Sequence, residues 1–289
     1  MTKRVLILGR SGKVGRHSAQ AFAQAGWEVR PYHRGTDDLM KVAQGCDVIV
    51  NGLNPPNYHD WQGLIPQITK QVISAARDSG ATVILPGNVY HFGDKGGIWS
   101  ERTPPAPVSK KGAIRLAMEQ DYAASGVQTI VLRAGNFMDP DSTDCVMSSV
   151  YLRAIKRGKI TLPGPIETRQ AMCFMPDWAR AAAALAERRG ALGRFEDIPF
   201  EGHTLCAREI KQGMEQILGR DLRAVQFPWW VFKIAAPVWE LAREMNEMRY
   251  LWATDHALYN ARLQGILPGF EVTPQQEVFA RMLAAAQRA

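Results

Sequence analysis

Short runs of apolar residues alternate, as far as residue 132, with longer segments in which apolar residues recur every three or four positions. The runs have the length of buried strands, and the longer segments have the period of helices that bury one face. Strands that alternate with helices pair in parallel. The pattern predicts strands at residues 5–8, 27–32, 47–51, 82–85 and 128–132 and helices at residues 14–25, 38–44, 64–79 and 112–125.

A glycine-rich turn follows the first predicted strand. The string VLILGRSGKVG places Gly9, Gly12 and Gly15 between that strand and the first predicted helix. Glycine there permits a tight turn, lets backbone N–H groups approach a pyrophosphate, and allows the helix to pack closely on the strand. The N-terminus of the helix then faces the anion. We therefore expect a dinucleotide-binding site at this turn.

The pattern is less regular in the rest of the chain. Asp177 is expected to cap an alanine-rich helix, WARAAAALAERR, whose arginines suit the negative end of the helix dipole. A strand near residues 194–200 and a helix at residues 207–218 are predicted after it. These elements indicate a second, smaller lobe that closes over the carboxyl ends of the parallel strands, where ligands bind in such sheets.

The expected fold class is α/β: a Rossmann-like doubly wound parallel sheet with a smaller, partly helical C-terminal substrate lobe. We assign residues 1–190 to an NAD(P)-binding Rossmann domain, with an excursion into the substrate lobe around residues 140–172. Residues 191–289 are assigned mainly to the substrate-binding lobe.

Composition narrows the classes of function. The chain has 35 Lys and Arg against 28 Asp and Glu, but the basic residues are dispersed, so we expect a small anionic ligand and no nucleic acid. Its four cysteines lack CxxC spacing and its six histidines lack ligand spacing, so we expect neither a disulfide framework nor a metal site. The first apolar run is too short for a signal peptide. A cytoplasmic protein is therefore expected.

The residues after the second predicted strand favour one form of the cofactor. An NAD site commonly places an acidic residue there to bind the ribose 2′-hydroxyl. Here the segment reads Tyr32, His33, Arg34, and no carboxylate occurs before Asp37. Arg34 and Arg10 can instead bind a 2′-phosphate through charge-assisted hydrogen bonds. We expect NADP(H) to be preferred over NAD(H), the alternative being that Arg34 is a solvated loop residue.

The candidate cofactor-binding residues lie in the glycine turn and at the ends of the other predicted strands. They are Gly9, Arg10, Ser11, Gly12, Lys13, Val14, Gly15, His33, Arg34, Asn51, Gly52, Leu53, Pro86, Gly87, Lys111, Gly135 and Asn136.

Several later segments resemble those of a known superfamily, in the same order. NVYHFG is similar to its strand-end VYG segment, ERTPPAP to its E-T-P loop, LRAGNFMDP to its R-P-x-x-x-Y-G-P segment and MPDWARA to its V-x-D-V-A-x-A helix start. Over most of residues 3–190 the chain resembles the extended or atypical short-chain dehydrogenase/reductase superfamily, of the NAD-dependent epimerase/dehydratase type. Its glycine motif is widely shared, whereas the ordered set is far more specific.

The resemblance implies a catalytic Ser or Thr, a Tyr, and a Lys four residues after the Tyr. Aligned on RLAME, which is similar to the family's K-x-x-x-E, Lys111 stands at the Tyr position and Arg115 at the Lys position. The Ser position falls on Pro86. No phenol therefore stands where the family's proton-transfer group stands.

Three interpretations of this departure remain open. Lys111 transfers the proton, as a lysine does in similar isoflavone-reductase-like relatives, with Arg115 on ribose or phosphate. Alternatively, Tyr90 or another hydroxyl supplies the proton and Asn88 orients the substrate carbonyl. In the third, catalysis is lost and the protein is an NADP-sensing regulator similar to NmrA-like proteins.

Each candidate catalytic residue also has a structural interpretation. Lys111, Arg115 and Glu119 have the spacing of a solvated ion-pair face on a helix. Tyr90 follows Val89 at a strand end, where an aromatic side chain often serves packing, and Asn88 can stabilise the turn after Gly87.

An aromatic segment, PWWVFKIAAPVW, begins at Pro228, and further tryptophan, tyrosine and methionine residues follow as far as residue 252. It is too short to span a bilayer. Core packing, an apolar substrate pocket and a homodimer interface are its competing uses, and contact with a membrane surface is the least favoured. We expect an NADP(H)-dependent reductase or dehydrogenase acting on a small apolar carbonyl or conjugated substrate. The alternative is a sugar-nucleotide epimerase or dehydratase.

Overall fold

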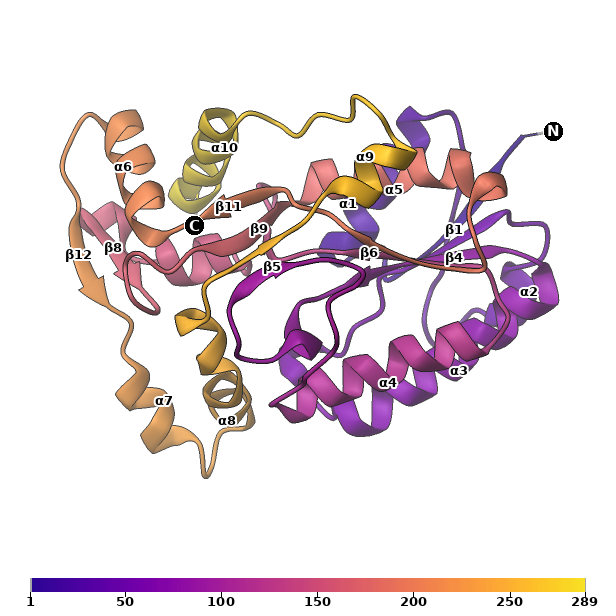
Figure 1. Cartoon of the computed structure of the whole chain (residues 1–289), viewed down its shortest axis with the longest axis horizontal. Helices are drawn as coiled ribbons and strands as arrows, with labels where there is room; N and C mark the ends of the chain where they lie inside the picture. Colours follow the sequence, from indigo (N-terminus) through magenta and orange to yellow (C-terminus); the bar gives the residue numbers. More distant parts are fainter. Residues whose placement is uncertain (1, 289) are drawn as a thin grey trace.

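The computed structural model describes residues 2–288, and its centre is a six-stranded parallel sheet (Figure 1). The strand order is β10-β6-β4-β3-β1-β2, so the chain winds outward in both directions from its first strand. The predicted doubly wound sheet is confirmed. Its strands are β1 (Arg4–Leu8), β2 (Glu28–Pro31), β3 (Val48–Asn51), β4 (Thr82–Gly87), β6 (Thr129–Arg133) and β10 (Phe195–Pro199).

Helices cover both faces of the sheet because successive strand residues point to opposite sides. Val5 and Ile7 of β1 pack toward α1 (Lys13–Gln24) and α5 (Met175–Arg188). Leu6 and Leu8 pack toward the other face. That face is covered by α2 (Leu39–Val42), α3 (Trp61–Ser79) and α4 (Lys110–Ala124), which lie below the sheet in Figure 1.

The smaller lobe is built from two separate parts of the chain. Its core is a three-stranded sheet, a two-stranded parallel pair and two helices. Three of its strands come before α5 and two come after it. The elements are β7 (Asn136–Met138), β8 (Lys159–Leu162), β9 (Gln170–Phe174), β11 (His203–Leu205), α6 (Ala207–Leu218), β12 (Arg223–Gln226) and α10 (Gln275–Arg288).

A third group of elements lies below this lobe in Figure 1 and borders the start of α4. It contains the helices α7 (Trp229–Ala235) and α8 (Glu240–Glu247). Beyond it, the strand β13 (His256–Leu258) pairs in parallel with β5 (Gly97–Trp99). The chain then forms α9 (Ala261–Ile266), which packs on β10.

Two expectations differ from this architecture. The segment expected as a strand of the substrate lobe, at residues 194–200, is β10, and it pairs with β6 at the edge of the central sheet. Asp177 does not cap α5: the helix begins two residues earlier, and Phe174 holds the N-cap position. The Asp177 carboxylate instead accepts hydrogen bonds from the N–H and hydroxyl of Thr273, at 2.8 and 2.7 Å.

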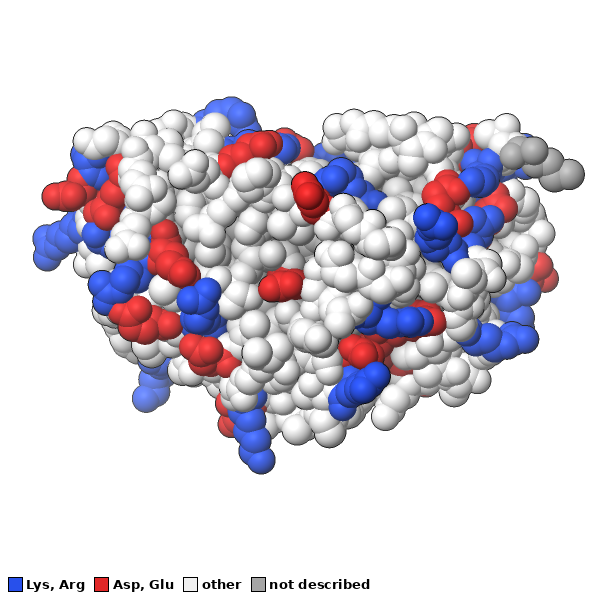
Figure 2. Space-filling view, turned by 45° about the horizontal axis from the view of Figure 1, so that its top comes forward, with Lys and Arg blue, Asp and Glu red and all other residues white. Residues whose placement is uncertain are grey.

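Basic and acidic side chains are interspersed over the face shown in Figure 2. This distribution agrees with the dispersed charge of the sequence. Within residues 2–288, no helix is both long enough and apolar enough to cross a bilayer.

Candidate functional site

The glycine turn has the geometry that its sequence predicts. Gly9 has φ +74°, in the left-handed region, and a Cβ placed on it would lie 2.8 Å from the carbonyl oxygen of Gly52 at the end of β3. A Cβ on Gly15 would lie 2.2 Å from the carbonyl oxygen of Gly9. The turn therefore requires glycine both for its conformation and for the approach of α1 and β3. Gly12 is the N-cap of α1. Because it has no side chain, it leaves the N-terminus of the helix uncovered, and an anion can bind there.

Neighbouring strand ends border this turn. Asn51 is buried at the end of β3, where its side chain accepts the N–H of Leu53 at 3.2 Å and donates to the Tyr122 hydroxyl at 3.2 Å. At the end of β4, Gly87 leaves no room for a Cβ beside the Val131 side chain, 2.6 Å away. The parallel sheet thus brings the strand-end candidates to one edge.

The remaining cofactor candidates differ in the ion pairs and hydrogen bonds that their side chains already make. Arg10 and Arg34 are exposed, and within residues 2–288 their side chains make no ion pair. Lys13 pairs with Asp144 at 2.9 Å. The side chain of Asn136 donates to Gln170 at 2.9 Å. These residues fit a dinucleotide: the turn offers backbone N–H groups, and two arginines remain available for phosphate.

Lys111 lies at the start of α4 and is 1% exposed. Its ammonium group donates to the carboxylates of Glu244 and Glu247, which lie on α8 in the C-terminal part of the chain. The same ammonium lies 5.1 Å from the centre of the Tyr58 ring. A buried ammonium needs such compensation, because an unpaired charge in the interior is costly. The alternative interpretation of this helix, a solvated ion-pair face, does not describe Lys111.

Arg115 is also buried, one turn further along α4. Its guanidinium donates to the side-chain oxygen of Asn54 at 2.7 Å and lies 4.5 Å from the centre of the Trp61 ring. Burial lowers the pKa of Arg115. Asn54 directly follows Leu53, a candidate cofactor residue, so Arg115 borders the expected cofactor site.

Tyr90 is held among these groups rather than aimed at open space. Its hydroxyl lies 3.3 Å from that of Tyr58, and burial raises the pKa of Tyr90 well above the ordinary value. The side-chain oxygen of Asn88 accepts a hydrogen bond from the N–H of Tyr90 at 3.0 Å. This contact is the one expected if Asn88 stabilises the turn. A phenolate at Tyr90 is thus strongly disfavoured.

A cleft of about 230 Å³ opens beside Lys111. Its walls come from the loop after β3, the start of α4 and the face of α8, and they include Tyr58, Trp61, Glu244 and Glu247. Three residues in the loop, Asn57, Tyr58 and Asp60, have left-handed φ values of 53°, 62° and 40°. Such conformations cost free energy in residues other than glycine, and they concentrate at ligand sites.

A third buried cation lies in the sheet itself. Arg133, at the end of β6, donates to Glu119 and Asp197, each at 2.7 Å, and to the carbonyl of Asn88 at 2.6 Å. Burial disfavours its charge, but the two carboxylates more than offset this effect, so the pKa of Arg133 is raised. His91 lies 3.2 Å from the same guanidinium, and burial, with help from Arg133, lowers the pKa of His91 to about 3.

One group has the composition of a metal site. His17, Asp139 and Asp141 offer ligand atoms that all lie within 4.8 Å of one another. Asp139, however, already accepts hydrogen bonds from His17 at 2.8 Å and from Arg16 at 2.6 Å. The Arg16 guanidinium would repel a cation, so the group acts as a network that joins α1 to the chain after β7.

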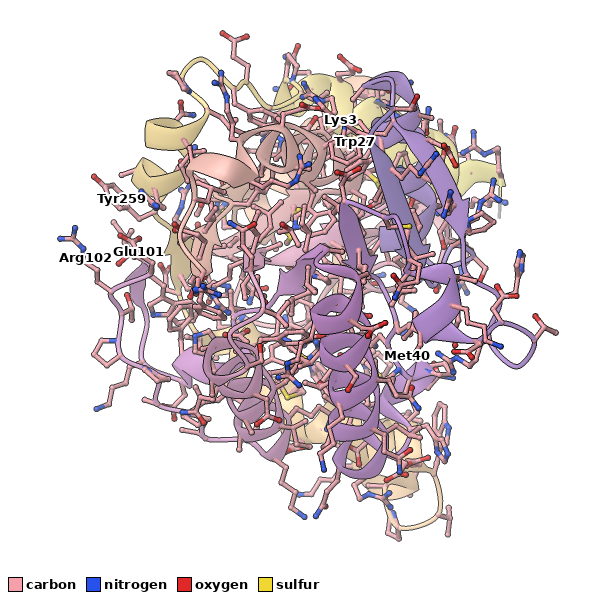
Figure 3. The ribbon with its side chains drawn as sticks, turned by 90° about the vertical axis from the view of Figure 1, so that its right-hand side faces the viewer. Lys3, Trp27, Met40, Glu101, Arg102 and Tyr259 are labelled. Atoms are coloured by element: carbon pink, nitrogen blue, oxygen red, sulfur yellow. The ribbon has the colours of Figure 1, made fainter. Side chains whose placement is uncertain are left out.

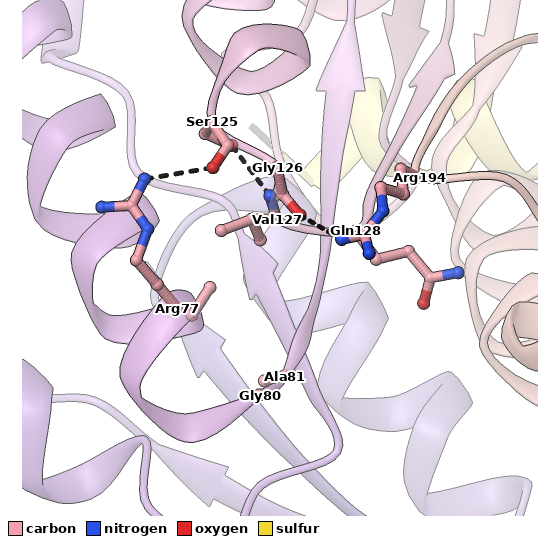
Figure 4. A pocket seen from close by; sticks show the side chains of 9 residues that line it. Arg77, Gly80, Ala81, Ser125, Gly126, Val127, Gln128 and Arg194 are labelled. Carbon is pink, nitrogen blue, oxygen red and sulfur yellow. Dashed lines mark hydrogen bonds between the residues drawn. The ribbon is translucent and has the colours of Figure 1, made fainter.

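A shallow hollow at the opposite end of the sheet has no candidate chemistry (Figure 4). It lies where β4 and β6 begin. Its arginines are engaged with backbone carbonyls: Arg77 donates to Ser125 at 3.1 Å, and Arg194 to Gly126 at 3.0 Å.

Glu244, Glu247, Tyr58 and Asn54 were not among the expected site residues. The two glutamates are spaced i, i+3 on α8, so their spacing already places them on one helical face. Their contact with Lys111 spans more than 130 residues of sequence, and no local pattern predicts it.

Comparison with known proteins informs the fold of the chain. No family model matches the chain, and no curated protein matches it in sequence. A UDP-glucuronic acid 4-epimerase from Bacillus cereus, solved with UDP-glucuronic acid and NAD, has a TM-score of 0.78 at 15% identity, covering 99% of this chain and 100% of that one. MoeE5, solved with UDP-glucose and NAD, has a TM-score of 0.77 at 16% identity and 99% coverage of both chains.

A nucleoside-diphosphate-sugar epimerase from Pseudomonas aeruginosa is similar over 100% of this chain and 98% of its own, with a TM-score of 0.74 at 14% identity. The chain has the fold of these enzymes. The resemblance to extended short-chain dehydrogenases/reductases is thus confirmed at the level of the fold.

Proposed function

We propose that the protein is an NADP(H)-dependent oxidoreductase that reduces a carbonyl or conjugated alkene. One observation supports the proposal: the ammonium of Lys111 is buried between two carboxylates and borders a cleft. The resemblance of RLAME to the family's K-x-x-x-E implies that Lys111 stands at the proton-transfer position. The loop after β3, which forms one wall of the cleft, starts at the same edge of the sheet as the dinucleotide turn after β1.

Each group then has a definite role. The N–H groups of the turn at Gly9 to Gly15 bind the pyrophosphate, and Arg10 and Arg34 bind the 2′-phosphate. The nicotinamide, when bound, supplies the hydride. Lys111 donates a proton from Nζ to the oxygen or carbon that becomes negative, and solvent replaces that proton. Glu244 and Glu247 accept hydrogen bonds from the ammonium and hold it in place.

A sugar-nucleotide epimerase or dehydratase is the second candidate, and it is supported by the UDP-sugars and NAD in the solved structures of similar fold. Epimerisation through a transient ketone requires removal of a proton from a hydroxyl group. Lys111, as an ammonium, has no lone pair for this step, and the pKa of Tyr90 is raised by burial. The geometry therefore favours proton donation, although NAD in those structures does not support the NADP preference.

Titration with the two cofactors tests the binding half of the proposal. NADPH should bind more tightly than NADH. Arg34→Ala should lower the affinity for NADPH at least tenfold and leave the affinity for NADH unchanged. Arg102→Ala, an exposed arginine on the loop after β5 (Figure 3), is the matched control. Tighter binding of NADH, or an unchanged NADPH affinity in Arg34→Ala, would contradict the assignment of Arg34.

Turnover tests the chemical half. With a panel of apolar aldehydes, ketones and enones, Lys111→Met should lower kcat at least 100-fold while NADPH still binds. Lys110→Met, which changes the exposed neighbouring lysine, should retain activity. Interconversion of UDP-sugars without net oxidation of NADH would establish the epimerase instead. NADPH binding with no turnover in either panel would indicate the non-catalytic regulator.

A further inference from the structure

The surface of α7 and the turn after it is unusually apolar. Ten large hydrophobic side chains are exposed within the described residues, and five of them lie between positions 230 and 239. Trp230 is 67% exposed, Ile234 72% and Val238 92%. Trp230 and Ile234 are four residues apart and so lie on one face of α7, one turn apart. Single exposed apolar residues need no explanation, whereas a contiguous group marks an interaction surface.

This surface belongs to an ordered helix. On the opposite face of α7, Trp229 is buried, and its ring nitrogen donates to the carbonyl of Pro163 at 2.7 Å. The ring of Phe232 lies 5.2 Å from Phe227 and 5.7 Å from Trp239. The side chain of Asn246 on α8 donates to the carbonyl of Phe232 at 2.8 Å. The inner contacts thus fix the helix, and its outer apolar face has no partner among residues 2–288.

The charged residue within the apolar segment is basic, and two arginines lie against the buried aromatic rings on its inner side. Residues 228–239 contain Lys233 and no acidic residue. Arg249 lies 5.4 Å from the Trp229 ring, and Arg153 lies 5.3 Å from the Phe227 ring. Within residues 2–288, none of these three cations makes an ion pair.

The acidic residues of the adjoining helix α8 are all occupied. Glu240 pairs with His59 at 2.9 Å, and Glu244 and Glu247 bind Lys111. No carboxylate of α8 therefore remains to neutralise the cations beside α7. The surface combines an aromatic and aliphatic face with uncompensated positive charge.

We propose that α7 and the turn to α8 dock on the surface of an anionic lipid bilayer. An amphipathic helix with Trp on its apolar face and basic residues beside it lies in the interface between lipid headgroups and acyl chains, about 5–10 Å deep. The turn protrudes at the bottom of the molecule in Figure 1, so it reaches a planar surface before the rest of the chain does. A second copy of this chain fits less well. Five side chains on a protruding turn offer less than the roughly 800 Å² that each partner of a stable interface buries.

Vesicle sedimentation tests this inference with the intact protein. We expect binding to vesicles of phosphatidylcholine and phosphatidylglycerol, at least tenfold weaker binding to phosphatidylcholine alone, and loss of binding as salt is raised. The double variant Ile234→Ser/Val238→Ser should bind the anionic vesicles at least tenfold more weakly. Ile98→Ser removes an equally exposed isoleucine on β5 and should bind like the wild type.

Other outcomes would overturn the inference. Equal binding by the double variant and by Ile98→Ser would show that this surface does not make the contact, and so would absence of binding to anionic vesicles. A dimer in light scattering that the double variant dissociates would assign the surface to a second copy. Arg34→Ala, which lies in the expected cofactor site and makes no ion pair within residues 2–288, should bind vesicles normally, so failure of the proposed function and failure of membrane docking are distinguishable. Thermal unfolding of each variant confirms that it is folded.

Discussion

Two buried cations, Arg133 and Lys111, lie between pairs of carboxylates, and their partners come from different parts of the molecule. Both partners of Arg133, Glu119 and Asp197, belong to α4 and β10 of the Rossmann layer. Both partners of Lys111 lie on α8, outside that layer. The first cluster therefore joins neighbouring elements of one framework. The second joins the framework to the part of the chain that forms the opposite wall of the cleft.

The chemistry of the two side chains matches these positions. A guanidinium presents several fixed donors and does not release its proton, so Arg133 can bind two carboxylates and a carbonyl at once. An ammonium is a compact charge that can transfer a proton. The contrast suggests that Arg133 contributes mainly to stability and Lys111 mainly to reaction, and the two roles can be separated by measurement.

The largest effect is expected for Arg133→Met. Removing the guanidinium leaves Glu119 and Asp197 without their shared counter-charge, and loss of one partner of a buried ion pair costs about 3–5 kcal/mol. Urea denaturation should show this decrease in the free energy of unfolding. Arg102→Ala, on the exposed loop in Figure 3, should change it by less than about 0.5 kcal/mol. Similar stabilities for the two variants would contradict a structural role for Arg133.

The glutamates provide a reciprocal test. Glu247→Gln should lower kcat by about 10–100-fold, equivalent to about 1.4–2.7 kcal/mol, because it weakens the hold on the Lys111 ammonium. Its free energy of unfolding should change little, since Glu244 remains and the Glu247 side chain is 25% exposed. Glu119→Gln should show the opposite pattern, with reduced stability and a smaller loss of kcat. If Glu247→Gln loses stability and keeps its activity, the contrast between the clusters is wrong.

The Arg133 cluster should also make stability depend on pH. Burial, with a smaller contribution from Arg133, lowers the pKa of His91 to about 3. Above pH 6.5 the residue is neutral in both the folded and the unfolded state. As the pH falls from 6.5 toward 3, only the unfolded state gains the proton, so stability is lost at about 1.4 kcal/mol per pH unit.

At pH 5 this loss should reach about 2 kcal/mol from His91 alone. Urea denaturation at pH 7.5 and pH 5 should therefore show a smaller difference for His91→Gln than for the wild type. Equal differences in both proteins would exclude His91 as a source. His33→Gln, an exposed histidine, is the control and should retain the full difference.

The smallest effect concerns the helix that carries Lys111. Ser109 is the N-cap of α4 and accepts the N–H of Gly112 at 3.0 Å. Ser109→Ala should lower the free energy of unfolding by about 1 kcal/mol, and Ser109→Gly by only a few tenths. Calorimetry of both variants measures the difference. A larger loss of kcat than of stability in Ser109→Ala would show that the cap also positions Lys111.

The local pattern of the sequence predicts most of the central sheet. The five strands expected before residue 133 all occur within one or two residues of their predicted ends, since buried apolar runs and the glycines after them are local signals. The start of α5 is a partial failure: Pro176, in the first turn of the helix, indicates a start before Asp177. Asp177 also suits the N-cap position, so the local sequence does not distinguish between the two starting points.

The candidate site is only half predictable. The local sequence identifies the glycine turn, Lys111 and Arg115 as candidates, because each is found from the spacing of residues in a motif. It does not identify Glu244 and Glu247 as partners, since the contact depends on how α8 packs on α4. It also does not show that β10 pairs with β6, because strand periodicity does not specify the neighbour.

The pairing of β10 with β6 has a consequence for biosynthesis. A ribosome completes β6 at Arg133 and reaches Asp197, the second partner of that arginine, 64 residues later. During this interval β6 is an open edge, and an open edge is where a nascent strand pairs with the wrong neighbour. The growing chain is therefore exposed to mispairing at β6 until β10 has been synthesised.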